Sequence, residues 1–161
     1  KKEFEKLNGP TLKEIISYFK KQYKIKENES KLLKIYEYEI ELIYSNDVKP
    51  IPNREELLNF LKKNEFNIAL VTSCSKKIIL SFLSKNNWES FFDLIISGDL
   101  VSKSKPNPEI YNLAVMKSKS NKNSILVLED SKNGHTSATK AGLNCVMVNK
   151  KSQEEIFSLF L

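Results

Sequence analysis

Short apolar segments alternate with amphipathic helical segments over the last two-thirds of the chain, and this alternation is the strongest constraint on the fold. The apolar segments lie at 66–71, 94–96, 125–128 and 145–148. Strands that are apolar on both faces and separated by helices predict a parallel sheet with helices covering both sides. We therefore expect an α/β fold, in which a Rossmann-like parallel sheet forms the middle of three layers.

Helices are expected before and between these strands, at 53–64, 75–85, 108–116 and 134–141. Proline and glycine indicate two of their ends. Asn107 is expected to cap the third helix, because Pro108 is tolerated in a first turn, where its nitrogen needs no partner. Gly142 is expected to end the fourth helix, because glycine readily adopts the left-handed conformation that often follows a helix.

The first third of the chain is helical and is expected to form a separate small domain. After a Gly9-Pro10 turn, Thr11 and Glu14 form a capping-box pattern, and apolar residues then recur at helical spacing. A second amphipathic helix is expected over 30–44. Two prolines interrupt the pattern at 46–52, which indicates a hinge. We therefore assign residues 1–50 to a helical cap domain and residues 51–161 to the α/β core.

Charge and composition argue against two classes of partner. The 161 residues carry a net charge of +6, but Arg54 is the only arginine, and arginine supplies the bidentate contacts that specific nucleic-acid recognition requires. No apolar run approaches the ~20 residues that span a bilayer. We therefore expect neither a nucleic-acid nor a membrane partner. The two cysteines, Cys74 and Cys145, are expected to be reduced, as in a cytoplasmic protein.

Polar side chains follow the predicted strands at the points where the strands end. Thr72 and Ser73 follow the first strand, and Lys105 lies in the loop after the second. Glu129 and Asp130 follow the third, and the fourth runs into residues 149–150. Because ligands of open parallel sheets bind beyond the carboxyl ends of the strands, we expect a hydroxyl, an ammonium and two carboxylates to meet at one edge.

These residue types together favour phosphate chemistry. Adjacent carboxylates such as Glu129 and Asp130 suit magnesium, whereas a threonine hydroxyl, backbone amides and a lysine suit an anion such as phosphate. Taken singly, each residue has a simpler interpretation: Thr72 could cap a helix, Lys105 could be solvated, and the acids could begin a helix. Their convergence on one edge favours a phosphoryl-transfer site.

The same segments resemble three motifs of the haloacid dehalogenase superfamily, in particular its phosphatases and β-phosphoglucomutase-like members with a helical cap. Residues 68–73 resemble a strand that ends in a phosphate-binding threonine or serine. Residues 102–111, with the sequence SKSKPNPEIY, are similar to the lysine motif, and residues 127–135, VLEDSKNGH, resemble the acidic motif. The resemblance covers nearly the whole chain.

On the substrate side, the resemblance implies a phosphatase that hydrolyses a small phosphorylated metabolite through an aspartyl-phosphate. Thr72 and Lys105 would be catalytic, and Thr72, Ser73 and Lys105 would bind the phosphoryl group.

On the metal side, the resemblance implies a magnesium cofactor. Glu129 and Asp130 would be its ligands. Ser131 and Asn133 would not touch the metal but would contact these ligands and hold them in place.

The chain departs from the family at one place. Family members begin with a strand that ends in Asp-x-Asp, whose first aspartate is the nucleophile. The aspartates of this chain do not fit that pattern; they are Asp47, Asp93, Asp99 and Asp130. We therefore expect the first strand and the first cap helix to be missing, and the chain alone to be inactive.

The missing strand would lie beside those that carry Thr72 and Glu129. Self-association, or complementation by the missing N-terminal segment, is expected to fill this gap. Two alternatives to a phosphatase remain open. One is a pseudo-phosphatase or phosphate-binding regulatory module. The other is a phosphosugar mutase, which is less favoured because Leu12 stands where the resembling mutases carry an arginine.

Overall fold

The computed structural model describes residues 10–148 and 151–161. The predicted roles of Gly9 in a turn and of residues 149–150 at a strand end lie outside the described residues. The strands are β1 (Ala69–Val71), β2 (Leu94–Ile96), β3 (Leu126–Glu129) and β4 (Asn144–Met147). The α-helices are α2 (Leu12–Gln22), α3 (Glu29–Asn46), α4 (Arg54–Lys63), α5 (Lys76–Lys85), α6 (Glu109–Ser118), α7 (Lys132–Lys140) and α8 (Gln153–Phe157). Short 3-10 helices lie at Glu89–Phe91, Gly98–Leu100 and Lys122–Ser124.

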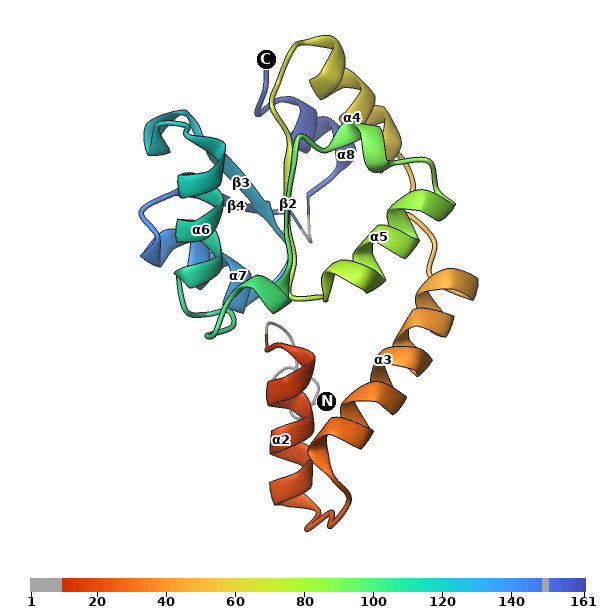
Figure 1. The fold of residues 1–161 in the computed structure, drawn as a ribbon. Helices are drawn as coiled ribbons and strands as arrows, with labels where there is room; N and C mark the ends of the chain where they lie inside the picture. Colours follow the sequence, from red (N-terminus) through yellow and green to blue (C-terminus); the bar gives the residue numbers. More distant parts are fainter. Residues whose placement is uncertain (1–9, 149–150) are drawn as a thin grey trace.

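The core has three layers, with the strands between two groups of helices (Figure 1). Helices α6 and α7 pack on one face, where Ile96 of β2 and Val127 of β3 join their buried side chains. Helices α4, α5 and α8 pack on the other face, where the neighbouring residues Ile95 and Leu128 contact them. Adjacent strand residues thus point to opposite helical layers, as the pleat of a strand requires. The predicted α/β fold is confirmed.

The strands form two separate parallel pairs, β1 with β2 and β3 with β4. Thr72 N donates to Ile96 O at 2.9 Å, so Thr72 and alternate residues of β1 face β2. In a parallel ladder the residues between them direct their N–H and C=O to the opposite side. The backbone N–H and C=O groups of Ala69 and Val71 therefore point away from β2. We call this side of β1 the inner edge of the first pair.

The second pair has an equivalent inner edge. Val148 N donates to Glu129 O at 2.8 Å, so Glu129 faces β4, and Leu126 and Leu128 face away from it. Within the part of the chain that the structure describes, no backbone ladder joins β1 to β3. The sheet is therefore interrupted between these two strands.

The limits of three of the four strands differ from the sequence prediction. The predicted strand at 66–71 is shortened to β1 because the Asp93 carboxylate accepts a hydrogen bond from Ile68 N at 2.7 Å, where a strand neighbour would otherwise bind. In addition, β3 and β4 each begin and end one residue away from the predicted limits. Boundaries of this kind depend on the pairing partner, which lies far away in sequence.

Helix ends follow their capping residues. Helix α7 begins two residues before the predicted start because Ser131 Oγ accepts from Gly134 N at 3.0 Å and caps the helix. Asn107 Oδ1 accepts from Glu109 N at 3.0 Å, although Pro108 occupies the formal capping position of α6. The prediction for Gly142 is confirmed: it follows α7 with a φ of 77°.

Helices α2 and α3 form a pair below the sheet (Figure 1). The predicted capping box of Thr11 and Glu14 is present at the start of α2. Helix α3 packs on α5 of the core, where Lys77 and Glu41 form an ion pair of 2.6 Å and Tyr44 contacts Phe82 edge-on. We propose that this pair belongs to the cap domain of residues 1–50.

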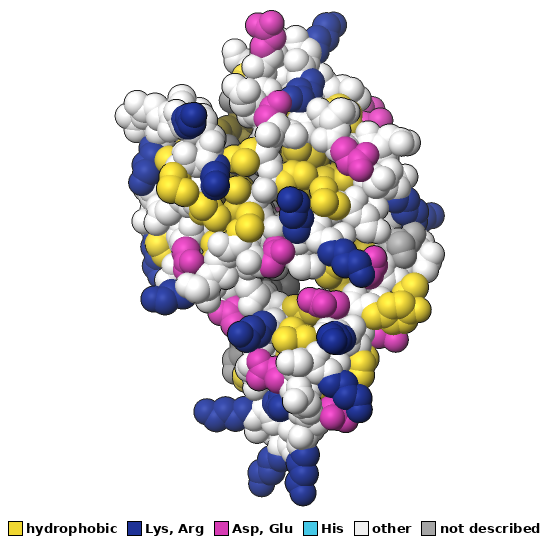
Figure 2. Space-filling view, in the orientation of Figure 1, with side chains coloured by type: hydrophobic (Ala, Val, Ile, Leu, Met, Phe, Trp, Pro, Cys, Tyr) yellow, Lys and Arg dark blue, Asp and Glu magenta, His cyan; other side chains and the backbone are white. Residues whose placement is uncertain are grey.

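The outer surface carries charges of both signs. On the face shown in Figure 2, basic and acidic side chains are interspersed over the helices. None of the helices within 10–148 and 151–161 has the length and apolar character needed to cross a membrane.

Candidate functional site

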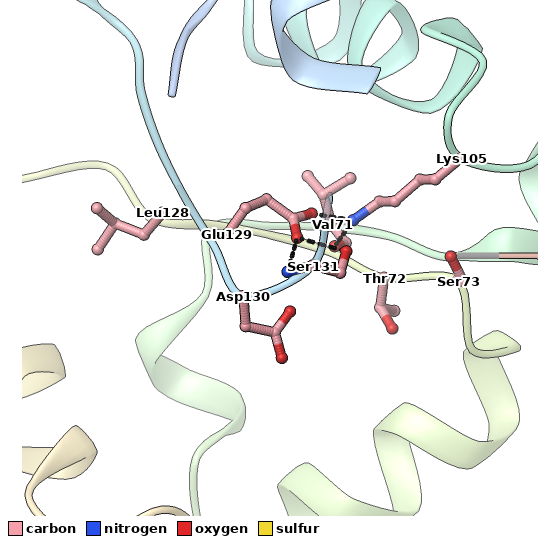
Figure 3. Close-up of a pocket in the computed structure, with 8 residues that line it drawn as sticks. All are labelled: Val71, Thr72, Ser73, Lys105, Leu128, Glu129, Asp130 and Ser131. Carbon is pink, nitrogen blue, oxygen red and sulfur yellow. Dashed lines mark hydrogen bonds and ion pairs between the residues drawn. The ribbon is translucent and has the colours of Figure 1, made fainter. Parts of the chain in front are cut away.

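A cavity of about 320 Å³ lies at the carboxyl ends of β1 and β3, where the sheet is interrupted (Figure 3). We call it the edge pocket. Its lining consists of Val71, Thr72, Ser73, Lys105, Leu128, Glu129, Asp130 and Ser131. Six of the seven site residues predicted from sequence therefore lie together. The seventh, Asn133, is half-buried in the first turn of α7 and is not part of the lining.

The hydroxyl side of the pocket is a tight turn after β1. Thr72 Oγ1 accepts from Cys74 N at 3.1 Å, which is a local side-chain turn typical of threonine. The loop after β2 supports this turn, since Gly98 N donates to Cys74 O at 2.8 Å. A Cβ atom on Gly98 would overlap the Ser73 carbonyl group. Glycine at this position therefore allows the two loops to approach closely.

Lys105 brings a buried ammonium group into the pocket, with only 6% of the residue exposed. Its Nζ forms an ion pair with Glu129 and donates to Val71 O at 3.3 Å and to Tyr111 Oη at 3.4 Å. An ammonium group has three N–H donors, so all three have acceptors. Val71 O lies on the unpaired inner edge of β1, and Lys105 thus binds a carbonyl that a strand neighbour would otherwise use.

Glu129, also 6% exposed, is held at both carboxylate oxygens. Oε1 accepts from Lys105 Nζ and, at 2.5 Å, from Tyr111 Oη. Oε2 accepts from Ser131 Oγ at 3.2 Å. Burial acts to raise the pKa of Glu129, but the charge and hydrogen bond of Lys105, with the donors of Tyr111 and Ser131, outweigh it and hold the pKa below its ordinary value. A Cβ atom on Gly134 would overlap this carboxylate.

Tyr111 was not assigned a role by the sequence analysis, although it lies within the lysine motif. The residue is 3% exposed, on the face of α6 that also buries Ile110 and Ala114. Burial and the negative charge of Glu129 raise the pKa of Tyr111, so its hydroxyl is a neutral donor. A tyrosine on an otherwise apolar helix face is the one sequence signal for such a role, because a buried hydroxyl needs a partner.

Asp130 differs from Glu129 in its surroundings. It is exposed, and its carboxylate points away from the hydrogen-bonded cluster around Glu129 (Figure 3). Among the described residues, no three His, Cys, Asp or Glu side chains are grouped closely enough to hold a metal ion. Magnesium in proteins is often bound by one or two carboxylates, with waters and substrate phosphate as further ligands. Glu129 and Asp130 are therefore of the type and number of ligands that magnesium takes from a protein.

Helix α2 contacts the loop that carries Lys105. Glu14 of α2 forms hydrogen bonds with the side chain and backbone of Ser104, which precedes Lys105. Burial acts to raise the pKa of Glu14, but the hydrogen bonds from Ser104 and Thr11 hold it below the ordinary value. The helical pair thus touches the loop that positions the buried ammonium.

The fold and pocket together define a class of protein. The carboxyl edge of the parallel sheet carries a hydroxyl turn, a buried lysine and two acids. This set is typical of α/β proteins that bind phosphate. The family of haloacid dehalogenase-like hydrolases matches residues 1–148, and the chain belongs to that family. The resemblance predicted from the motifs is therefore confirmed.

Individual relatives agree with this assignment. The chain is 35% identical over 101 residues to a phosphorylated carbohydrates phosphatase of Thermotoga maritima, a match that covers 63% of this chain and 47% of that protein. The chain spans about half the length of the curated relatives it matches.

Solved structures share the fold. A β-phosphoglucomutase from Clostridium difficile is similar with a TM-score of 0.72 and 26% identity, covering 95% of this chain and 70% of that one. CbbY from Rhodobacter sphaeroides in complex with phosphate has a TM-score of 0.83 and 24% identity, covering 91% of this chain and 69% of that one. The relatives similar to this chain thus include a phosphatase and a mutase.

Proposed function

We propose that this protein provides most of the active site of a magnesium-dependent phosphatase, which hydrolyses a small phosphorylated metabolite in the cytoplasm through an aspartyl-phosphate. The observation that carries the proposal is the buried Lys105 ammonium opposite the Thr72–Ser73 turn in the edge pocket. An ammonium and a set of N–H and O–H donors at one cavity favour a bound phosphoryl group. The free thiols of Cys74 and Cys145 support the cytoplasmic location.

On the substrate side, the Thr72 hydroxyl and the backbone of Ser73 would bind two phosphoryl oxygens. Lys105 would bind a third and neutralise the charge that develops during transfer. In the arrangement described above, Lys105 has no donor left for a substrate. One of its neutral acceptors, Val71 O or Tyr111 Oη, must therefore be replaced for the ammonium to reach a phosphoryl oxygen.

The nucleophile would come from a strand that fills the interruption between β1 and β3. We propose that this strand belongs to an N-terminal segment of the same protein and ends in Asp-x-Asp. Its backbone would pair with the inner edges at Ala69 and Val71 on one side and Leu126 and Leu128 on the other. The strand would take over Val71 O from Lys105, which frees an ammonium donor at the point where the nucleophile enters.

On the metal side, Asp130 and Glu129 would hold the magnesium ion, with Ser131 fixing Glu129 and Asn133 nearby on α7. When bound, magnesium supplies charge stabilisation for the phosphoryl oxygens. The chain's own contribution is to keep Glu129 ionised and oriented and to leave Asp130 accessible.

A second candidate function is a phosphate-binding module without turnover. It is favoured by the hydrogen bonding of Glu129, which is engaged at both oxygens by protein donors, so that no buried carboxylate among the described lining residues is free to attack phosphorus. Such a module would bind phosphate in the edge pocket and release it unchanged.

A strand-complementation experiment separates these functions. The chain alone is compared with a version extended at its N-terminus by an apolar strand ending in Asp-x-Asp, using p-nitrophenyl phosphate and magnesium. We expect hydrolysis only in the extended version, and loss of hydrolysis when the first aspartate of the added strand is replaced by asparagine. Hydrolysis by the chain alone, or by the asparagine version, would contradict the proposal. Size-exclusion chromatography of both versions shows whether self-association fills the interruption instead.

A further inference from the structure

We infer that Tyr111 is a positioning residue, whose hydroxyl fixes the Lys105 ammonium and the Glu129 carboxylate relative to each other in the edge pocket. The importance of this pair for phosphate binding rests on the proposed function. The geometric claim itself does not, because it concerns groups that are already in contact.

Three groups meet at one point. Tyr111 Oη donates to Glu129 Oε1 at 2.5 Å and accepts from Lys105 Nζ at 3.4 Å. The Lys105 ammonium also pairs with the same carboxylate oxygen and lies 5.0 Å from the centre of the tyrosine ring. The hydroxyl is therefore the only side-chain group in these contacts that touches both charged partners, as acceptor for one and donor for the other.

The ammonium and the carboxylate need a fixed hydrogen-bond partner because both side chains can rotate. Lysine carries its charge on a flexible stem of four carbons. A carboxylate rotates about its terminal bond, and such torsions have broad preferences. Tyr111 has two side-chain torsions, and its ring is packed in the buried cluster that includes Ile110 and Ala114 of the same helix. The packing of α6 therefore fixes the position of Oη, and the hydrogen bonds of Oη fix the ammonium and the carboxylate relative to it.

The opposite side of the carboxylate is fixed independently. Ser131 Oγ binds Oε2 at 3.2 Å, so Glu129 is held from the β3 side by Ser131 and from the α6 side by Tyr111. Of these two hydroxyls, only that of Tyr111 contacts Lys105 in the bonds observed. Loss of the Tyr111 hydroxyl should therefore change the position of the Lys105 ammonium. If the ring only filled space, removing the hydroxyl would leave the ammonium unchanged.

The substitution Tyr111→Phe isolates the hydroxyl, because the ring and its packing are kept. The matched control is Tyr38→Phe on α3, where the tyrosine is 60% exposed. The readout is the ¹⁵N–¹H signal of the Lys105 ammonium, which is buried and hydrogen-bonded and should exchange slowly enough to be observed. Its assignment comes from loss of the signal in Lys105→Met.

We expect the Lys105 ammonium signal in the unsubstituted chain and in Tyr38→Phe, and its broadening or loss in Tyr111→Phe, with circular dichroism showing that the variant is folded. An unchanged ammonium signal in folded Tyr111→Phe would overturn the inference. If Tyr111→Phe does not fold, the unsubstituted chain decides: a nuclear Overhauser effect between the Tyr111 hydroxyl proton and the Lys105 ammonium supports the inference, and its absence contradicts it.

A second readout separates this inference from the proposed function. In the strand-extended version, Tyr111→Phe should lower kcat about tenfold, the size of effect typical when a group behind an active-site side chain is removed. Absence of all hydrolysis in the unsubstituted extended version would argue against the proposed phosphatase, while the ammonium signal would still test Tyr111. Full activity of Tyr111→Phe together with an unchanged ammonium signal would remove Tyr111 from the site.

Discussion

Replacing Lys105 by methionine should destabilise the chain strongly at neutral pH, because it leaves a buried carboxylate without its counter-ion. The side chains of Lys105 and Glu129 are 7% and 6% exposed. Removal of one partner from a buried ion pair typically costs ~3–5 kcal/mol. Methionine keeps most of the apolar stem, and Tyr111 and Ser131 continue to donate to Glu129. We therefore expect the lower end of this range, about 3 kcal/mol.

Urea unfolding measures this loss, with the fluorescence of Trp88 as the probe. Trp88 is the single tryptophan and is 7% exposed in the core beside α5, so its emission should change on unfolding. With a slope of ~1–3 kcal/mol per molar urea, a loss of about 3 kcal/mol lowers the midpoint by about 1–3 M. The control Lys103→Met changes an exposed lysine two residues away and should stay within ~0.5 kcal/mol of the unsubstituted chain.

The pH dependence identifies the cause as charge. The pKa of Glu129 is lowered from its ordinary value of 4.5 in the folded chain, so the stability that the pair contributes is present above that pH and is lost as the pH falls through the folded pKa. The difference between the unsubstituted chain and Lys105→Met should therefore shrink below about pH 4.5. A midpoint equal to that of Lys103→Met, or a difference that is the same at pH 7 and at pH 4, would refute the reasoning.

Three further predictions concern the same pocket. Gly134→Ala places a Cβ atom against the Glu129 carboxylate and should cost ~1–3 kcal/mol in urea unfolding, and an unchanged midpoint would show that the carboxylate can move aside. Asp130→Asn should leave the unfolding midpoint unchanged because the side chain is exposed. In the strand-extended version it should weaken magnesium binding, measured by calorimetry, and an equal magnesium affinity would exclude Asp130 as a ligand. In that version Lys105→Ala should lower kcat by about a hundredfold or more, and Lys103→Ala should have little effect; equal effects would show that the buried ammonium has no special role.

The sequence was sufficient for the architecture because the apolar strands and the residues after them carry that information locally. Thr72, Lys105 and Glu129 each follow a strand or stand in a recognisable motif, so their meeting at one edge could be predicted. Strand lengths could not be predicted in the same way. The start of β1 depends on the Asp93 carboxylate, which binds Ile68 across 25 positions of the chain.

Which residues form the site could be predicted from the sequence, but how these residues bind one another could not. The sequence analysis treated Lys105 and Glu129 as separate binders of phosphate and metal, whereas they bind each other in the structure. Spacing does not reveal this contact, because it depends on how far the lysine stem is buried and on where α6 places Tyr111. Gly134 offered a partial signal: a glycine in the first turn of a helix is unfavourable in itself, and its absent side chain leaves room for the Glu129 carboxylate.

The division of the sheet into two strand pairs has a thermodynamic consequence. The hydroxyl end of the edge pocket belongs to the β1–β2 pair, and the carboxylate end belongs to the β3–β4 pair. An anion that contacts both ends of the pocket would fix the distance between the two strand pairs. A strand that binds between the pairs would fix the same distance, so the two binding equilibria are coupled. Such coupling is reciprocal, and each ligand must raise the affinity of the other by the same factor. A phosphate analogue would therefore promote assembly of the sheet as well as compete with the substrate.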